Sequence, residues 1–168
     1  MTTLYLVRHG ETVDNRAQIM QGQTPGRLND TGRAQARELG ERLRGERIDA
    51  FVSSDLYRSV ETCEIIARPH GKPVVTTALL RERDWGGFTG RFIPDLKDEV
   101  WPADIESMDA MRDRARRFLA WVSETYPERT VLAVGHGIIN KVIQSVYHGK
   151  PVQEIARMTN AEVRVLTL

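Results

Sequence analysis

Two histidines stand in short motifs that directly follow apolar stretches of the chain. The first motif is Arg8-His9-Gly10-Glu11-Thr12 and the second is Gly135-His136-Gly137. A neutral imidazole can attack phosphorus and carry a phosphoryl group covalently, which splits one difficult step into two easier ones. A neighbouring arginine such as Arg8 can bind the oxygens of that group through two parallel hydrogen bonds. These residue types together indicate phosphoryl transfer.

Two further segments supply groups that this chemistry needs. Arg58 follows Ser53-Ser54-Asp55, and Glu82 stands between two arginines. The transferred group carries negative charge over three oxygens in the transition state, so a second arginine suits it. A carboxyl group can protonate the leaving oxygen and then deprotonate the attacking water. A second, protonated histidine, here His136, can donate a hydrogen bond to the developing charge.

The elements that must position these residues alternate along the chain. Short apolar runs predict strands, and longer runs with helical periodicity predict helices. The predicted strands are residues 3–7, 48–53, 73–77, 130–134 and 162–168, the last of them at an edge of the sheet. The predicted helices run from Asp30 or Thr31 to 44, from Ser54 or Asp55 to 67, from Ser107 to 126 and from 138 to 147, with the named residues as N-caps.

Strands separated by helices imply parallel pairing, because parallel neighbours need a crossover connection. We therefore expect an α/β fold, a three-layer sandwich whose mostly parallel central sheet is flanked by helices. Ligands of such folds bind beyond the carboxyl ends of the strands, and the polar motifs follow the strands at that edge. Residues 83–106 contain three glycines, two prolines and two tryptophans, and we interpret them as a loop with one short helix.

Composition narrows the class of protein. The chain has 168 residues, and its 24 basic and 23 acidic side chains give a net charge of +1. We expect one domain over residues 1–168, with neither nucleic acid nor a membrane as a partner, because such partners usually require a basic excess or a long apolar run. The single cysteine, Cys63, excludes an internal disulfide, and we expect it in the core. The first residues do not have the pattern of a signal peptide, so we expect a cytoplasmic location.

The motifs taken together resemble those of the histidine phosphatase superfamily, which includes the phosphoglycerate mutase-like branch. The opening motif followed by Asn15 resembles that family's first motif. The resemblance continues in the family's order through Gln21-Gly22, Leu28-Asn29-Asp30-Thr31-Gly32, Ser53-Ser54-Asp55-Leu56 with Arg58, Glu82 through Gly90, Glu106-Ser107 and Gly135-His136-Gly137. It implies a phosphoglycerate mutase-like fold with a short lid at residues 83–106.

The resemblance also implies a role for each matching residue. His9 would be the nucleophile that becomes phosphohistidine, and Glu82 the general acid and then the base, with Asp84 as the alternative. The remaining roles are binding of the phosphoryl group by Arg8, Arg58 and His136, and binding of substrate by Asn15, Gln21, Gly22 and the backbone of Gly137. No metal and no other cofactor is implied, because the arginines neutralise charge as a metal would.

Two activities share this set of residues. The segment from Glu82 to Gly90 is similar to that of the mutases, but the mutases have a long insertion after it where this chain has only residues 91–106. A short lid should leave the pocket open to water, so we expect a phosphatase acting on a small phosphorylated metabolite. A phosphoglycerate mutase, a phosphoprotein (phosphohistidine) phosphatase and a catalytically silent phosphate-binding module are the alternatives, and the natural substrate stays open.

Three other features favour plain structural interpretations. Arg112, Arg114, Arg116 and Arg117 are spread around the outer faces of a helix with an apolar stripe, which predicts a solvated face. The close spacing of histidines that is typical of zinc sites is absent, so no metal is expected. A final strand at an edge could pair with a second copy and so form a homodimer.

Overall fold

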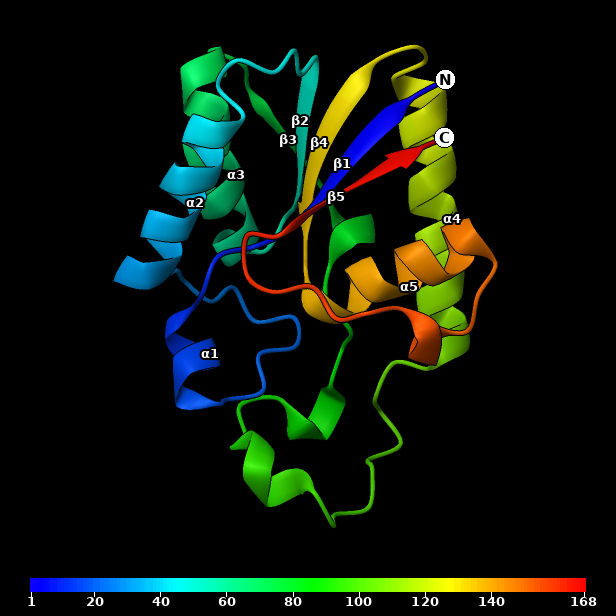
Figure 1. The fold of residues 1–168 in the computed structure, drawn as a ribbon. Helices are drawn as coiled ribbons and strands as arrows, with labels where there is room; N and C mark the ends of the chain where they lie inside the picture. Colours follow the sequence, from blue (N-terminus) through cyan, green and yellow to red (C-terminus); the bar gives the residue numbers. More distant parts are fainter.

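A five-stranded sheet forms the centre of the molecule in a computed structural model that describes all 168 residues (Figure 1). Its strands are β1 (Thr3–Arg8), β2 (Ala50–Ser54), β3 (Val74–Thr77), β4 (Thr130–Gly135) and β5 (Val163–Thr167). They lie in the order β3-β2-β4-β1-β5, and only β5 is antiparallel to its neighbour. The prediction of a mostly parallel sheet with the last strand at an edge is confirmed.

Helices cover both faces of this sheet, as expected for a three-layer sandwich. Helices α2 (Asp30–Arg42) and α3 (Tyr57–Ala67) pack on one face, and α4 (Met108–Thr125) and α5 (Gly137–His148) pack on the other (Figure 1). A short helix that the sequence analysis missed, α1 (Val13–Ala17), follows the first motif. No helix is both long enough and apolar enough to cross a membrane.

The core consists of two clusters, one on each side of the sheet. Leu4 and Leu6 of β1 face α4 and α5, where they join Phe118, whereas Val7 joins the cluster under α2 and α3. Because both faces are covered, the middle residues of β1 and β4 are apolar on both faces, as is usual for parallel sheets. Cys63 lies in the second cluster as expected, and its burial raises the pKa of the thiol, which makes it unreactive.

Two of the three predicted helix caps are wrong. Asn29 caps α2 instead of Asp30 or Thr31, because its side chain accepts the Gly32 N–H at 2.8 Å while Asp30 is already helical. Helix α3 begins after Leu56, which has no side-chain cap, since Ser54 still belongs to β2 and Asp55 pairs with an arginine. Ser107 caps α4 as predicted, accepting the Ala110 N–H at 3.1 Å.

A contact between two backbones fixes the first motif on the end of β1. A Cβ atom on Gly32, in the first turn of α2, would lie 2.0 Å from the carbonyl oxygen of Glu11. A Cβ on Gly10 would in turn lie 2.5 Å from the carbonyl oxygen of Gly32. Only glycine at both positions lets the start of α2 approach the motif so closely.

The lid, residues 83–106, contains two short 3-10 helices, Gly86–Phe88 and Ile93–Leu96, where one helix was expected. It is fixed to the segment after α1 by backbone hydrogen bonds, from Gly90 N–H to Met20 O at 2.8 Å and from Met20 N–H to Arg91 O at 2.9 Å. The lid therefore lies against the loop that carries Gln21 and Gly22, two residues expected to bind substrate.

Candidate active site

The strand ends meet at one pocket of about 370 Å³. Strands β1, β2 and β4 are neighbours in the sheet, so the motifs that follow them are brought to the same edge. Every residue expected at the site except His136 lines this pocket: Arg8, His9, Asn15, Gln21, Gly22, Arg58, Glu82 and Gly137. His136 lies directly behind the wall and is fully buried.

The imidazole of His9 is oriented by the backbone. Its Nδ1 lies 2.7 Å from the carbonyl oxygen of Gly10, to which it can only donate, so Nδ1 carries the proton and Nε2 keeps its lone pair. Burial, and next the charge of Arg58, hold the pKa of His9 well below the ordinary histidine value. His9 is therefore a neutral imidazole at neutral pH, which is the form that can act as a nucleophile.

His136 lies beside it, with the two ring centroids 5.1 Å apart and the rings edge to face. Its Nε2 lies 2.9 Å from Ser54 Oγ and 3.2 Å from Ser59 Oγ, while its buried Nδ1 has no partner in the protein. Burial and the charge of Arg58 hold its pKa well below the ordinary value. This direction favours a neutral ring over the protonated one expected from the sequence, and a neutral ring still has one N–H to donate.

Two buried guanidinium groups flank these histidines. Arg8 donates to the carbonyl oxygen of Met158 at 2.7 Å, and Arg58 donates to those of Gly22 at 2.8 Å and Thr24 at 2.5 Å. Burial lowers the pKa of Arg58 to about 10, so it stays charged at neutral pH. Neither arginine forms an ion pair, and the Nε of each is buried without a partner. Two unpaired buried cations at a pocket favour an anionic ligand.

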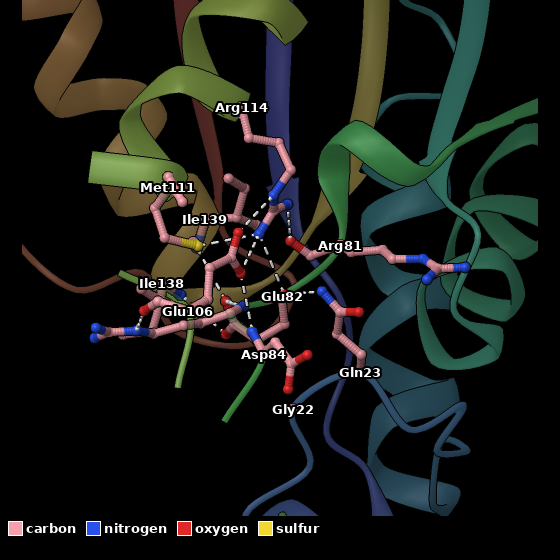
Figure 2. Close-up of polar contacts among 12 residues, drawn as sticks. Gly22, Gln23, Arg81, Glu82, Asp84, Glu106, Met111, Arg114, Ile138 and Ile139 are labelled. Carbon is pink, nitrogen blue, oxygen red and sulfur yellow. Dashed lines mark hydrogen bonds and ion pairs between the residues drawn. The ribbon is translucent and has the colours of Figure 1, made fainter. Parts of the chain in front are cut away.

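The carboxylate of Glu82 lies at the amino end of α5 (Figure 2). Its Oε2 accepts the Ile138 N–H at 3.0 Å, and its Oε1 accepts the N–H groups of Ile139 at 3.0 Å and Arg83 at 2.9 Å. The rival Asp84 is exposed, accepts the Gly86 N–H at 2.9 Å and does not line the pocket. The structure therefore places Glu82, and not Asp84, beside the histidines and arginines.

The smaller polar residues form the side of the pocket nearest α1. Asn15 and Thr12 cap α1 reciprocally, and the hydroxyl of Thr12 also donates to Gln21 Oε1 at 3.0 Å. Glu11 does not line the pocket, and its carboxylate accepts from the side chain of Asn29 at 2.8 Å. Gly137 lies beside Arg8, since a Cβ there would be in ordinary van der Waals contact with the guanidinium carbon at 3.5 Å.

Sequence analysis missed two cations that line the same pocket, Lys141 and Arg157. Neither forms an ion pair. Lys141 lies one helical turn after Gly137, and that spacing could have identified it. Arg157 lies in an irregular stretch after α5, where no periodic pattern indicates which way a side chain points. The described residues contain no cluster of three or more metal-ligating side chains.

Known proteins are similar to this chain over most of its length. The family model described as "Histidine phosphatase superfamily (branch 1)" matches residues 4–168. The chain is 37% identical to the "Uncharacterized phosphatase PhoE" of Bacillus subtilis over 96% of this chain and 86% of that protein. It is also 37% identical to the "Probable phosphoglycerate mutase GpmB" of Citrobacter koseri, over 90% of this chain and 77% of that protein.

A solved structure shares the whole arrangement of helices and strands. It is that of a mycobacterial glucosyl-3-phosphoglycerate phosphatase in complex with VO3, which superposes with a TM-score of 0.88. The two sequences are 28% identical, and the superposition covers 98% of this chain and 92% of the other. The relatives thus include proteins named as phosphatases and proteins named as mutases.

Proposed function

This chain belongs to the histidine phosphatase superfamily, branch 1, and from that premise we propose that it is a metal-independent phosphatase of small phosphomonoesters. The observation that carries the proposal is the free Nε2 of His9 in a pocket with two unpaired arginines and one carboxylate. Each of these groups has a distinct part in the two steps of hydrolysis.

In the first step Nε2 of His9 attacks phosphorus, and the bond from phosphorus to the ester oxygen breaks. Glu82 gives its proton to that oxygen as it leaves, so the product alcohol departs neutral. Oε2 is the oxygen suited to carry this proton, because it accepts one backbone N–H whereas Oε1 accepts two. Arg8 and Arg58 hold the phosphoryl oxygens and neutralise their charge.

In the second step water attacks the phosphohistidine. The carboxylate of Glu82 takes a proton from this water, the phosphorus–nitrogen bond breaks, and inorganic phosphate leaves as His9 regains its lone pair. His136 donates its Nδ1–H to a phosphoryl oxygen throughout, and Asn15, Gln21, Gly22 and the Gly137 N–H bind substrate around the reacting group.

The lid favours hydrolysis over the mutase reaction. Mutases that this chain resembles use basic residues of a long insertion to hold the substrate carboxylate. Here the lid gives the pocket only Trp85 and Ile93, while Arg91 pairs with Glu99 at 2.6 Å and Lys97 does not line the pocket. The lid therefore places no cation in the pocket that could hold a phosphorylated intermediate while that intermediate reorients.

The charge of the pocket indicates which small metabolites it suits. Arg8 and Arg58 match the dianionic phosphoryl group, which leaves Lys141 and Arg157 for a second anionic group of the same molecule. Arg157 lies close enough to Arg8 that its charge lowers the pKa of that arginine, second only to burial. A compact substrate with a carboxylate or a second phosphate, rather than a bulky phosphoprotein, fits this distribution.

The test is release of phosphate from nitrophenyl phosphate in EDTA, with wild type beside His9→Ala. We expect turnover by the wild type, none by the variant, and a phosphorylated histidine trapped by rapid alkaline quench of the wild type, because the phosphorus–nitrogen bond is stable in alkali. Phosphate release that disappears in EDTA, or that survives loss of His9, would refute the proposal. If neither protein releases phosphate, conversion of 3-phosphoglycerate to its isomer tests the mutase alternative.

A further inference from the structure

Arg114, which the sequence pattern assigned to a solvated face, is largely buried, with 13% of its side chain exposed. It lies on α4 and points toward the segment that carries Glu82 (Figure 2). The prediction was wrong because helical spacing shows which face is apolar but not that the lid returns across another face. The other three arginines of that group are more exposed, and Arg112 and Arg117 pair with acidic residues on their own helix.

The guanidinium of Arg114 binds three backbone carbonyl oxygens within the four residues that end at the proposed general acid. It donates to the carbonyl oxygens of Leu79 at 3.1 Å and Glu82 at 3.4 Å, and also to that of Arg81 between them. The side chain of Gln23 donates to the same carbonyl of Glu82 at 3.1 Å. Since a carbonyl has two lone pairs, both donors can hold the Glu82 backbone at once.

Arg114 is itself fixed by Glu106, the residue before the cap of α4. The pair is bidentate, with Nε at 3.1 Å from Oε2 and Nη2 at 2.9 Å from Oε1, and both side chains are mostly buried. Glu106 also accepts the Asp84 N–H on its side chain at 3.0 Å and donates its own N–H to Asp84 O at 2.9 Å. The ion pair therefore joins the two ends of the lid and the backbone of Glu82 in one network.

Glu82 is thus held from two sides. From the α5 side, the N–H groups of Ile138 and Ile139 hold its carboxylate, and from the α4 side Arg114 holds its main chain. The contacts to the carboxylate must loosen when Glu82 gives up and regains a proton, whereas those to the main chain need not change. A fixed main chain would keep the carboxyl group beside the leaving oxygen through both steps.

On the basis of the proposed phosphatase function, we propose that the Arg114–Glu106 pair is a positioning device for Glu82. It touches neither substrate nor reacting atoms, and acts by setting where the general acid stands. Its loss should affect only steps that need proton transfer. A displacement of about 1 Å in a catalytic group can cost about a hundredfold in rate, and we expect a loss of that order with substrates whose leaving group must be protonated.

The experiment compares two substrates in Arg114→Met. Glycerol phosphate has a poor leaving group that needs the proton, and nitrophenyl phosphate has a good one that needs it little. We expect kcat/KM, which reports the first step, to fall about a hundredfold for glycerol phosphate and far less for nitrophenyl phosphate, because only the poor leaving group needs the proton in that step. Glu106→Gln, which keeps the side-chain shape and removes the charge, should shift the same ratio of rates in the same direction.

Arg112→Met is the matched control, since Arg112 lies on the same helix but pairs with the exposed Asp109. It should leave both rates unchanged. Addition of guanidinium ion to Arg114→Ala should partly restore the rate with glycerol phosphate, an effect that a general loss of stability would not produce. Thermal unfolding shows whether each variant is folded at the assay temperature. If Arg114→Met is not folded, the ratio of the two rates in Glu106→Gln decides the test.

The possible failures can be told apart. If the wild type does not hydrolyse nitrophenyl phosphate, or His9→Ala does, the phosphatase function itself is wrong. If the wild type is active but folded Arg114→Met and Glu106→Gln lower kcat/KM for both substrates by the same factor, or for neither, the phosphatase function stands and the positioning role is overturned.

Discussion

The hydroxyl oxygen of Ser54 lies 2.9 Å from Nε2 of His136 and also accepts the Leu56 N–H at 3.2 Å. Because that amide uses an acceptor site of the hydroxyl, the Ser54 proton is free to point at the imidazole. The neutral ring of His136 then accepts at Nε2 and carries its own proton at Nδ1, the buried nitrogen with no protein partner. The Ser54 contact is thus compatible with the tautomer that can donate from Nδ1 to a phosphoryl oxygen.

Replacement of Ser54 by alanine should therefore reduce turnover without unfolding the protein. One buried hydrogen bond contributes about 0.5–1.5 kcal/mol, so we expect kcat to fall by roughly three- to tenfold, with Ser59 as the remaining partner. The double variant Ser54→Ala/Ser59→Ala should lose more. Ser53→Ala is the control, because Ser53 is buried nearby but bonds only to the backbone of Ser54. Nitrogen NMR of His136 should show Nδ1–H in the wild type, and an Nε2–H signal would contradict this account.

The pH dependence follows from the neutral state of His9. Protonation of Nε2 removes the lone pair that attacks phosphorus, so on the acid side activity should fall as the pH drops through the pKa of His9. Since burial and the Arg58 charge hold that pKa well below 6.5, the acid limb of kcat/KM for nitrophenyl phosphate should lie well below pH 6.5.

Direct titration of the imidazole measures the pKa of His9 independently of catalysis. Arg58→Gln removes a charge that lowers the pKa of His9, so the imidazole should titrate at higher pH in that variant even though it binds phosphate poorly. NMR of the His9 ring measures this in the free protein. An unchanged titration in Arg58→Gln would mean that burial alone sets the protonation of His9.

Two cations, Lys141 and Arg157, line the pocket without an ion pair, and they allow a test of the substrate class. Lys141→Met should raise KM for 3-phosphoglycerate by roughly tenfold, which corresponds to about 1.4 kcal/mol, and should leave nitrophenyl phosphate nearly unaffected because it has no second acidic group. Lys150→Met, at an exposed position just after α5, is the control. Equal changes for both substrates would place Lys141 at the phosphoryl group instead of at a second subsite.

The close approach of Gly32 to Glu11 predicts a large effect on stability. A methyl group at position 32 would lie 2.0 Å from a backbone oxygen that no side-chain rotation can move away. Gly32→Ala should therefore lower the free energy of unfolding by about 1–3 kcal/mol or more, measured by urea denaturation. Gly45→Ala is the matched control, since nothing lies within 4 Å of a Cβ there, and it should be nearly neutral.

Much of the fold and of the candidate site could be predicted from the sequence, because both depend on local patterns. Apolar runs identified all five strands, and the motifs after them, together with the family resemblance, identified eight of the residues that line the pocket, from Arg8 to Gly137. Sequence patterns could not predict how a segment far away in the chain buries or positions a side chain. The burial of Arg114 depends on Glu106 at the far end of the lid, and the position of Arg157 depends on an irregular connection.

Helix boundaries were less predictable for a different reason. Asn29, Asp30 and Thr31 are all good capping residues, and only the packing of Gly32 on Glu11 decides that the helix begins after Asn29. The protonation of His136 was also beyond the sequence, since it depends on complete burial beside Arg58.

The order of strands has a consequence for how the protein is made. Strand β1 pairs only with β4 and β5, so the first strand to leave the ribosome finds its partners among the last. These contacts join residues far apart in the chain. Such a topology folds slowly, because a long loop must close before β1 can contact its partners. During synthesis β1 and its histidine should stay unpaired until residue 130 and beyond have emerged. A nascent chain that stops before β4 should therefore have no phosphatase activity, and its apolar first strand is a natural target for chaperones.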